Sequence, residues 1–232
     1  MRLDKFVSQC TALSRTHAKK VITSGGVSLA GATVKDPSVK VSSAAVVVCG
    51  GRILSLPGPR YLMFNKPSGA VCTSIEDDAR SVFSWLGIEN VSGLHIAGRL
   101  DIDTTGLVLM TDDGAWSHLL TSPKKQCGKR YRVKLADALP EDAAEQFEVG
   151  IQLKGERQLT RSAQLSILSS RDVLLTIHEG KYHQVKRMFA ALGNRVVGLH
   201  REQVGPIRLD TALAPGEWRW LSEQEISSVG SI

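Results

Sequence analysis

Two aspartates stand close together in residues 98–107, which read GRLDIDTTGL. Asp101 and Asp103 could act as paired carboxylates in acid–base or nucleophilic chemistry, or as ligands for a metal ion. If the segment is extended, side chains two residues apart share a face and could cooperate. If it turns at residues 103–106, Asp103 instead accepts hydrogen bonds from nearby backbone groups, as Asp and Thr commonly do. The spacing alone leaves both interpretations open.

A second group of polar side chains lies in residues 179–189, EGKYHQVKRMF. At helical spacing His183, Lys186 and Arg187 fall on adjoining faces, and the apolar residues of the same stretch point inward. The pattern is typical of a solvated basic helix face.

Tyr131 belongs to a third segment, residues 129–135, in which charged and apolar residues alternate. Alternation of this kind predicts a half-buried strand. In such a strand the Tyr131 ring is expected to pack in the core with its hydroxyl directed outward.

The elements that must position these segments fall into two groups. In the first group a helix is expected over residues 3–12, and Ser14 is expected to cap a second helix that runs from 15 to about 24. Short strands are expected at 27–29, 32–34 and 44–48, with a tight turn at Ala30-Gly31. The Gly- and Pro-rich stretch at about 50–60 is typical of a linker. We therefore predict domains over residues 1–56 and 60–232.

The second group mixes strands and helices. Strands are expected at 61–64, 107–110, 129–135 and 173–178, and near 195–200, 207–209 and 218–221. Helices are expected at 80–86, 115–120, 140–149 and 182–192. Because the strands come in neighbouring runs without strict strand–helix alternation, the order favours an α+β fold, with a largely antiparallel or mixed central sheet and flanking helices.

The net charge of +6 is confined to the first quarter of the chain. Residues 1–56 contain two acidic and eight basic side chains, so they carry 8 − 2 = +6 and the rest of the chain is neutral overall. The eight basic residues are Arg2, Lys5, Arg15, Lys19, Lys20, Lys35, Lys40 and Arg52. This asymmetry indicates a module that binds a polyanion, joined to a nearly neutral body.

Other classes of protein are disfavoured by composition. The four cysteines form no CxxC pair and the six histidines form no HExxH motif, so the sequence offers no support for a metal site. No apolar run reaches the length of a membrane helix, and the N-terminus lacks a signal-peptide core. A cytoplasmic protein with reduced cysteines is the expectation.

The three segments, taken in order, resemble the motifs of the pseudouridine synthases of the RsuA/RluB/E/F type. Residues 64–69 (FNKPSG) resemble the first motif of that family, residues 98–107 its catalytic motif, and residues 180–188 its third. The basic first quarter resembles an S4 (α-L) RNA-binding domain. Within the family, the run from residue 98 to 118 is most similar to the enzymes that act on small-subunit rRNA.

The resemblance implies an isomerisation that needs no cofactor, in which uracil leaves its ribose, rotates and is reattached through C5. It implies uridine-516 of 16S rRNA as the target and Asp101 as the nucleophile. The cation beside Asp101 would be Lys186, with Arg187 as the alternative. Tyr131 would stack on the displaced uracil, and Arg99 would hold the displaced position or contact a phosphate. Direct attack on the sugar and a glycal route are both left open.

The resemblance also implies residues that surround the reacting groups. Lys66 and Pro67 would shape the wall of the active site. Contacts with RNA phosphates would come from Arg2, Lys5, Arg15, Lys19, Lys20, His183 and Arg187. The expected partner is 16S rRNA or the assembling small ribosomal subunit, and the protein is expected to act as a monomer.

Two other functions fit parts of the sequence. The first is a non-catalytic rRNA-binding factor for ribosome assembly, against which the intact set of Asp101, Tyr131 and Lys186 argues. The second is a metal-dependent RNA hydrolase that would use the acids at 101, 103, 112 and 113, against which the lack of any ligand spacing argues.

Overall fold

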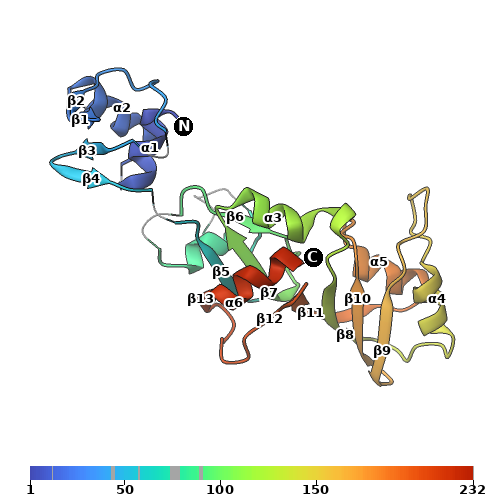
Figure 1. Ribbon diagram of the computed structural model, residues 1–232. Helices are drawn as coiled ribbons and strands as arrows, with labels where there is room; N and C mark the ends of the chain where they lie inside the picture. The colour runs from blue at the N-terminus through green and yellow to red at the C-terminus, as the bar shows by residue number, and fades with distance from the viewer. Residues whose placement is uncertain (12, 43–44, 57, 74–78, 89–90, 232) are drawn as a thin grey trace. The chain divides into compact units, whose positions relative to one another are not determined.

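The chain folds into two compact units, Met1–Pro59 and Arg60–Ile232. They are seen in a computed structural model that describes residues 1–11, 13–42, 45–56, 58–73, 79–88 and 91–231 (Figure 1). Each unit has its own hydrophobic core.

The N-terminal unit packs two helices against a small sheet. Helix α1 spans Leu3–Cys10 and α2 spans Arg15–Thr23, with the Ser14 hydroxyl accepting from the His17 N–H as a cap. The sheet has the order β2-β1-β3-β4. Its strands are β1 (Val27–Leu29), β2 (Ala32–Thr33), β3 (Val47–Cys49) and β4 (Arg52–Leu54).

Strand β4 lies inside the stretch that the sequence assigned to a linker, so that part of the prediction is wrong. Gly50 and Gly51 have φ of 55° and 77°, the left-handed region that a tight hairpin turn requires. The two glycines therefore join β3 to β4 and do not end the unit.

Asp4 is a buried acid in this otherwise basic unit. Its side chain is fully buried, and its carboxylate accepts from Arg2 (3.0 Å) and Arg15 (3.2 Å). The hydrogen bond from Arg2, together with those from Arg15 and the Lys5 backbone N–H, outweighs the effect of burial and lowers the pKa of Asp4 to about 2. The ionised carboxylate thus joins the start of α1 to α2.

We expect Asp4→Asn to destabilise the N-terminal unit by about 2 kcal/mol at neutral pH, because a charge-assisted network is lost. Since the folded pKa lies below the unfolded value, this contribution is present above about pH 4 and is lost as the pH falls toward 2. Urea unfolding of the full chain, followed by hydrogen exchange in residues 1–59, measures the effect at neutral pH and at a pH near 2. Asp36→Asn, at an exposed acid of the same unit, should change little. Equal effects of the two variants would contradict this account.

The C-terminal unit is built on a mixed sheet with the strand order β13-β5-β7-β11-β8-β10-β9. Strands β5 and β7 pair antiparallel, β7 and β11 parallel, and β11 and β8 antiparallel. The strands are β5 (Tyr61–Lys66), β6 (His95–Ala97), β7 (Thr105–Thr111), β8 (Lys129–Leu135), β9 (Gln164–Ser169), β10 (Asp172–Ile177), β11 (Val196–Val204), β12 (Ile207–Arg208) and β13 (Trp218–Trp220). The helices are η1 (Val82–Trp85), α3 (Gly114–Thr121), η2 (Pro123–Lys125), α4 (Ala143–Val149), α5 (Gln184–Ala191), α6 (Glu223–Ser228) and η3 (Val229–Ser231). The prediction of an α+β fold with a largely antiparallel, mixed sheet is confirmed.

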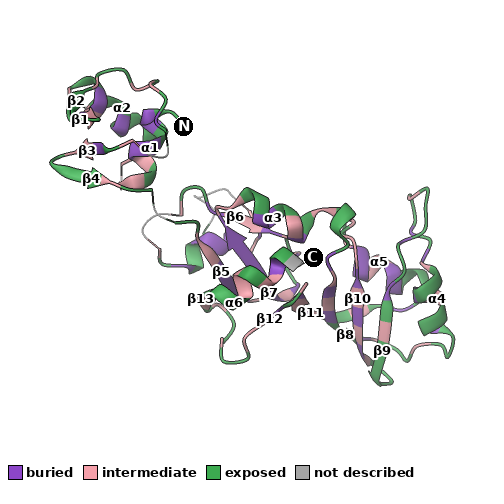
Figure 2. Cartoon of the chain, viewed as in Figure 1, coloured by how far each residue is buried: buried purple, intermediate pink, exposed green. Residues whose placement is uncertain are grey.

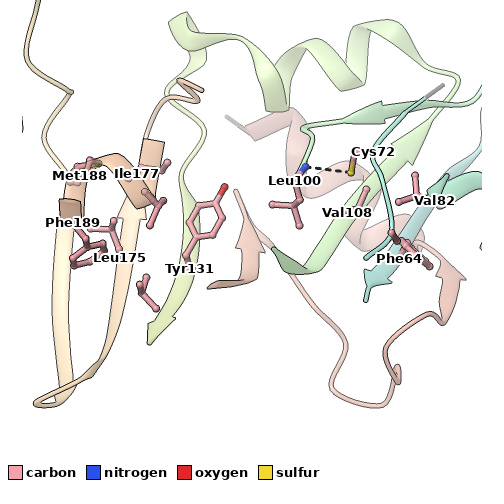
Figure 3. Close-up of a cluster of buried hydrophobic side chains, with 14 of the residues drawn as sticks. Phe64, Cys72, Val82, Leu100, Val108, Tyr131, Leu175, Ile177, Met188 and Phe189 are labelled. Carbon is pink, nitrogen blue, oxygen red and sulfur yellow. Dashed lines mark hydrogen bonds between the residues drawn. The ribbon is translucent and has the colours of Figure 1, made fainter. Parts of the chain in front are cut away.

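Both faces of the central strands are covered. Strands β5 and β7 are buried along nearly their whole length (Figure 2), with Phe64 and Val108 in one apolar cluster and Met63 and Leu107 in another. The first cluster continues to α4 and α5, which meet through their phenylalanines with ring centres 4.9 Å apart. The two halves of the sheet thus share one core, drawn in Figure 3. None of the described helices combines the length and apolar character needed to cross a membrane.

Candidate active site

Residues 101–104 form a turn immediately before β7. The Thr104 N–H donates to the Asp101 carbonyl at 3.1 Å, which closes the turn. Lys66, at the end of β5, is fully buried, and its ammonium group donates to the carbonyl oxygens of Ile102 (3.1 Å) and Thr104 (2.8 Å). Burial lowers the pKa of Lys66. The sequence left an extended segment and a turn at residues 103–106 both open. The structure has a turn that begins two residues earlier, and Lys66 is the side chain that fixes it to the sheet.

Asp101 faces two basic side chains from the start of α5. Its carboxylate lies 3.3 Å from the Lys186 Nζ and 3.5 Å from the His183 Nε2. The same Lys186 Nζ lies 2.6 Å from the Asp103 carboxylate. Asp103 and Asp101 therefore share one lysine.

The charges of this cluster stabilise one another. Partial burial acts to lower the pKa of Lys186, but the hydrogen bond to Asp103 and the charge of Asp101 outweigh burial and raise it. The hydrogen bond from Lys186 lowers the pKa of Asp103. At neutral pH the cluster therefore holds an ammonium group between two carboxylates.

The choice between Lys186 and Arg187 is decided by helix geometry. Consecutive residues on a helix point about 100° apart, so only one of the two can face the turn. Arg187 lies 3.2 Å from the Glu156 carboxylate and donates to the backbone carbonyls of Tyr182 and Lys154. Lys186 is the residue that the structure brings to Asp101.

Asp101, Lys186 and Tyr131 line one cavity of about 990 Å³. Tyr131 lies on β8, where its ring is 7% exposed and packs between the two halves of the core shown in Figure 3. The cavity is wide enough to hold a nucleotide. The segments 98–107, 129–135 and 179–189 of the sequence thus meet at one place.

The other residues predicted for this site divide into two groups. Arg99 and His183 line the cavity, and the Arg99 side chain is exposed. Lys66 and Pro67 are not among the residues that line it, and Lys66 can shape its wall only indirectly. The reason is that the Lys66 side chain is directed at the turn carbonyls, and it acts on the cavity through the turn.

Two cavity residues, Arg201 and Lys129, were not assigned roles from the sequence. Arg201, on β11, is 1% exposed and donates to the carbonyls of Leu107 (2.8 Å) and Gly98 (2.7 Å). Lys129 is 9% exposed and has the same strand parity as Tyr131. The alternation of the strand could have placed Lys129 on the same face as Tyr131. No comparable pattern in the sequence pointed to Arg201.

The predicted RNA-binding residues of the N-terminal unit fall into two groups. Lys5, Lys19 and Lys20 are exposed on α1 and α2. Arg2 and Arg15 are half exposed and pair with Asp4, so they also hold the unit together.

The acids at 112 and 113 are engaged elsewhere in the C-terminal unit. Asp112 pairs with Arg60 at 2.7 Å, and Asp113 caps α3 and accepts from the Tyr61 hydroxyl. Within the described ranges no three His, Cys, Asp or Glu side chains gather as a metal centre would require. The four acids proposed for a metal-dependent hydrolase therefore do not come together.

Comparisons with known proteins match the chain over its full length. Residues 60–191 match the family model described as RNA pseudouridylate synthase, and residues 1–47 match that of the S4 domain. The ribosomal small subunit pseudouridine synthase A of Vibrio cholerae is 52% identical over 229 residues, which are 99% of each chain.

Further relatives show the same match. The ribosomal small subunit pseudouridine synthase A of Escherichia coli K12 is 50% identical over 230 residues, which are 99% of this chain and 100% of that one. A crystal structure of a pseudouridylate synthase superposes with a TM-score of 0.72 at 46% identity, covering 99% of both chains.

Proposed function

The chain belongs to the RNA pseudouridylate synthase family, and from that premise we propose that it converts one uridine of small-subunit rRNA to pseudouridine. The S4 domain supports an RNA substrate, and the full-length similarity to the small-subunit enzymes of Vibrio cholerae and Escherichia coli supports the choice of rRNA. The position that we propose is uridine-516 of 16S rRNA, which follows the resemblance to the small-subunit enzymes.

The observation that carries the proposal is the meeting of Asp101, Lys186 and Tyr131 in one cavity. In the proposed reaction the C1′–N1 bond breaks, the uracil turns, and C5 bonds to C1′ while the C5 proton leaves and N1 gains a proton. Asp101 drives the first step, either as a nucleophile at C1′ or within a glycal route. Because the reaction rearranges bonds within one nucleotide, we propose that it proceeds without a cofactor.

The other cavity residues suit a uridine that has left its stack. Flipping a base out of a helix costs a few kcal/mol, and an aromatic ring can recover part of that cost by stacking. We propose that the Tyr131 ring takes this role and that the exposed Arg99 contacts the displaced strand or a phosphate. Lys186 places its positive charge beside the Asp101 carboxyl group.

The N-terminal unit supplies affinity for RNA in this account. We propose that Lys5, Lys19 and Lys20 contact phosphates, that His183 does so at the cavity, and that Arg187 does so outside it on α5. One chain contributes both the RNA-binding unit and the cavity, which supports action as a monomer. Because the proposed substrate is rRNA, we propose that the activity is cytoplasmic.

We expect simultaneous replacement of Lys5, Lys19 and Lys20 by Ala to weaken rRNA binding and to flatten its dependence on salt. Each lost phosphate contact lowers the slope of log K against log salt by about 0.7–0.9, so the slope should fall by about 2–3. Filter binding at several salt concentrations measures it. The matched control replaces Lys134 and Arg208, which are exposed on the C-terminal unit. An unchanged slope in the triple variant would show that RNA docks elsewhere.

The proposed function is tested in cells that lack the gene. Pseudouridines in their rRNA are mapped by carbodiimide modification and primer extension. The proposal predicts the loss of one pseudouridine in small-subunit rRNA, restored by the wild-type protein. A complete set of pseudouridines together with a defect in subunit assembly would instead favour the non-catalytic binding factor.

A further inference from the structure

The cavity contains two buried cations that have no acidic partner. Lys129 and Arg201 both line it and are 9% and 1% exposed. Among the described residues neither forms an ion pair with a carboxylate, whereas Lys186 in the same cavity pairs with two. A buried charge without a counter-charge is costly. The two cations therefore either destabilise the fold or form a binding site for an anionic ligand.

Both side chains keep donors that the protein does not use. The Lys129 ammonium has three N–H groups, and its one bond in the structure goes to the Cys127 carbonyl at 3.0 Å. Arg201 uses its guanidinium to bind the carbonyls of Leu107, Gly98 and Arg99, and two of its five N–H groups remain. Burial lowers the pKa of Lys129 and the charge of Arg201 lowers it further, which is the effect of like charges that lie near each other. An anion between them would relieve both costs.

The sheet directs these cations at the ring of Tyr131. Lys129 and Tyr131 are two residues apart on β8, so their side chains share a face. Arg201 stands opposite Tyr131 in the β8–β11 ladder, and its guanidinium carbon lies 6.0 Å from the centre of the tyrosine ring. A base stacked on Tyr131 would thus lie beside Lys129 and Arg201, which form the cationic end of the cavity.

The proposed reaction generates an anion that this end could hold. When the C1′–N1 bond breaks, the electron pair stays with the base, and the uracil carries a negative charge spread over N1 and its two carbonyl oxygens. The charge disappears when C5 bonds to C1′ and N1 regains a proton. Between those events the base must be retained while it rotates. Fixed donors aimed at the place where charge develops are the most effective way to lower such a barrier.

We propose that Lys129 and Arg201 form a binding site for the detached uracil in its anionic form. The inference rests on the proposed function and adds a catalytic role for two cations that the Asp101 cluster does not use. Asp101 and Lys186 act on the sugar side of the broken bond, and Lys129 and Arg201 act on the base side. Arg201 also holds the backbone at Gly98 and Leu107, so Lys129 is the cleaner residue to test.

The experiment compares Lys129→Met, Lys129→Arg and a control, Arg132→Met. Arg132 lies on the same strand with its side chain 48% exposed and paired to Asp172. Single-turnover conversion is measured for rRNA with uridine or 5-fluorouridine at the target, by the disappearance of that nucleoside on chromatography. Fluorine withdraws electrons and stabilises the base anion without help from the protein. RNA affinity and its salt dependence are measured in parallel.

We expect Lys129→Met to slow conversion of uridine about 100-fold, as is typical when one donor to a developing anion is removed. The loss should be smaller for 5-fluorouridine, and Lys129→Arg should recover most of the rate because it keeps the charge. Thermal stability should be retained, since the substitution removes a buried charge that has no partner. Arg132→Met should match the wild type.

Three results would overturn the inference. Equal losses on the two substrates would mean that Lys129 only shapes the cavity, and an unchanged rate would mean that it has no role. Weaker RNA binding with a flatter salt dependence would mean that it contacts a phosphate. Failure of the wild type to convert uridine would instead overturn the proposed function, so the two failures are distinguishable.

Discussion

Asp101→Asn is expected to abolish pseudouridine formation, with a loss of about 10⁴-fold or more in the single-turnover rate. Asparagine has the same shape as aspartate but lacks the charge and the nucleophilic oxygen. The fold should persist because the Asp101 side chain is 30% exposed and α5 keeps the contact of Lys186 with Asp103. RNA affinity should also persist, since it comes from phosphate contacts elsewhere. Chromatography of the digested rRNA measures the rate.

Asp103→Asn is the matched control for that experiment. Asp103 belongs to the same turn and binds the same lysine, but its side chain is 64% exposed. We expect a loss of about tenfold or less, because a solvent-exposed ion pair contributes about 1 kcal/mol. The Lys186 Nζ lies closer to Asp103 (2.6 Å) than to Asp101 (3.3 Å). A larger loss for Asp103→Asn than for Asp101→Asn would reverse the two assignments.

Gly106→Ala is expected to destabilise the C-terminal unit by about 3 kcal/mol or more. Gly106 has a φ of 99°, and a Cβ there would lie 2.4 Å from the Arg201 carbonyl oxygen and 2.9 Å from the Arg201 backbone nitrogen. Those are backbone atoms of the partner strand, so β7 and β11 would have to separate. The separation would displace Arg201 and the turn that carries Asp101, and activity should fall with stability.

Gly114→Ala tests whether the effect depends on position. Gly114 is the first residue of α3, and a Cβ there meets no atom within 4 Å. This substitution should be neutral or stabilise by about 0.5 kcal/mol. Urea unfolding followed by tryptophan fluorescence compares the two variants, because all four tryptophans lie beyond residue 60. Similar midpoints for the two variants would contradict the close contact between β7 and β11.

Much of the fold could be predicted from local patterns. The alternation of residues 129–135 predicted β8 with the observed bounds, and Ser14 predicted the start of α2. The motifs at 98–107 and 180–188 contained Asp101 and Lys186, the strand expected at 129–135 contained Tyr131, and the three residues meet in the cavity. The division into an S4 domain and a pseudouridine synthase domain agrees with the family models. These features depend on neighbouring residues or on a motif, so the sequence carries them directly.

Other features depend on tertiary contacts that no local pattern encodes. Lys66 reaches the turn at 101–104 only because β5 and β7 are neighbours in the sheet. Arg201 reaches Gly98 because β11 pairs with β7, across more than 90 residues of chain. Arg2 and Arg15 were predicted to bind RNA, and their pairing with the buried Asp4 had no signal in the sequence. Each of these contacts depends on how the chain folds and not on a local pattern.

Release of tritium from small-subunit rRNA that carries 5-tritiated uridine tests the central claim most directly. Reattachment through C5 must expel the hydrogen on that carbon, and neither binding nor hydrolysis of the RNA does so. The account predicts that the wild type releases up to about one tritium per rRNA molecule, equally with and without EDTA, and that Asp101→Asn releases none. No release by the wild type from naked or protein-bound rRNA, or release by Asp101→Asn at the wild-type rate, would contradict it.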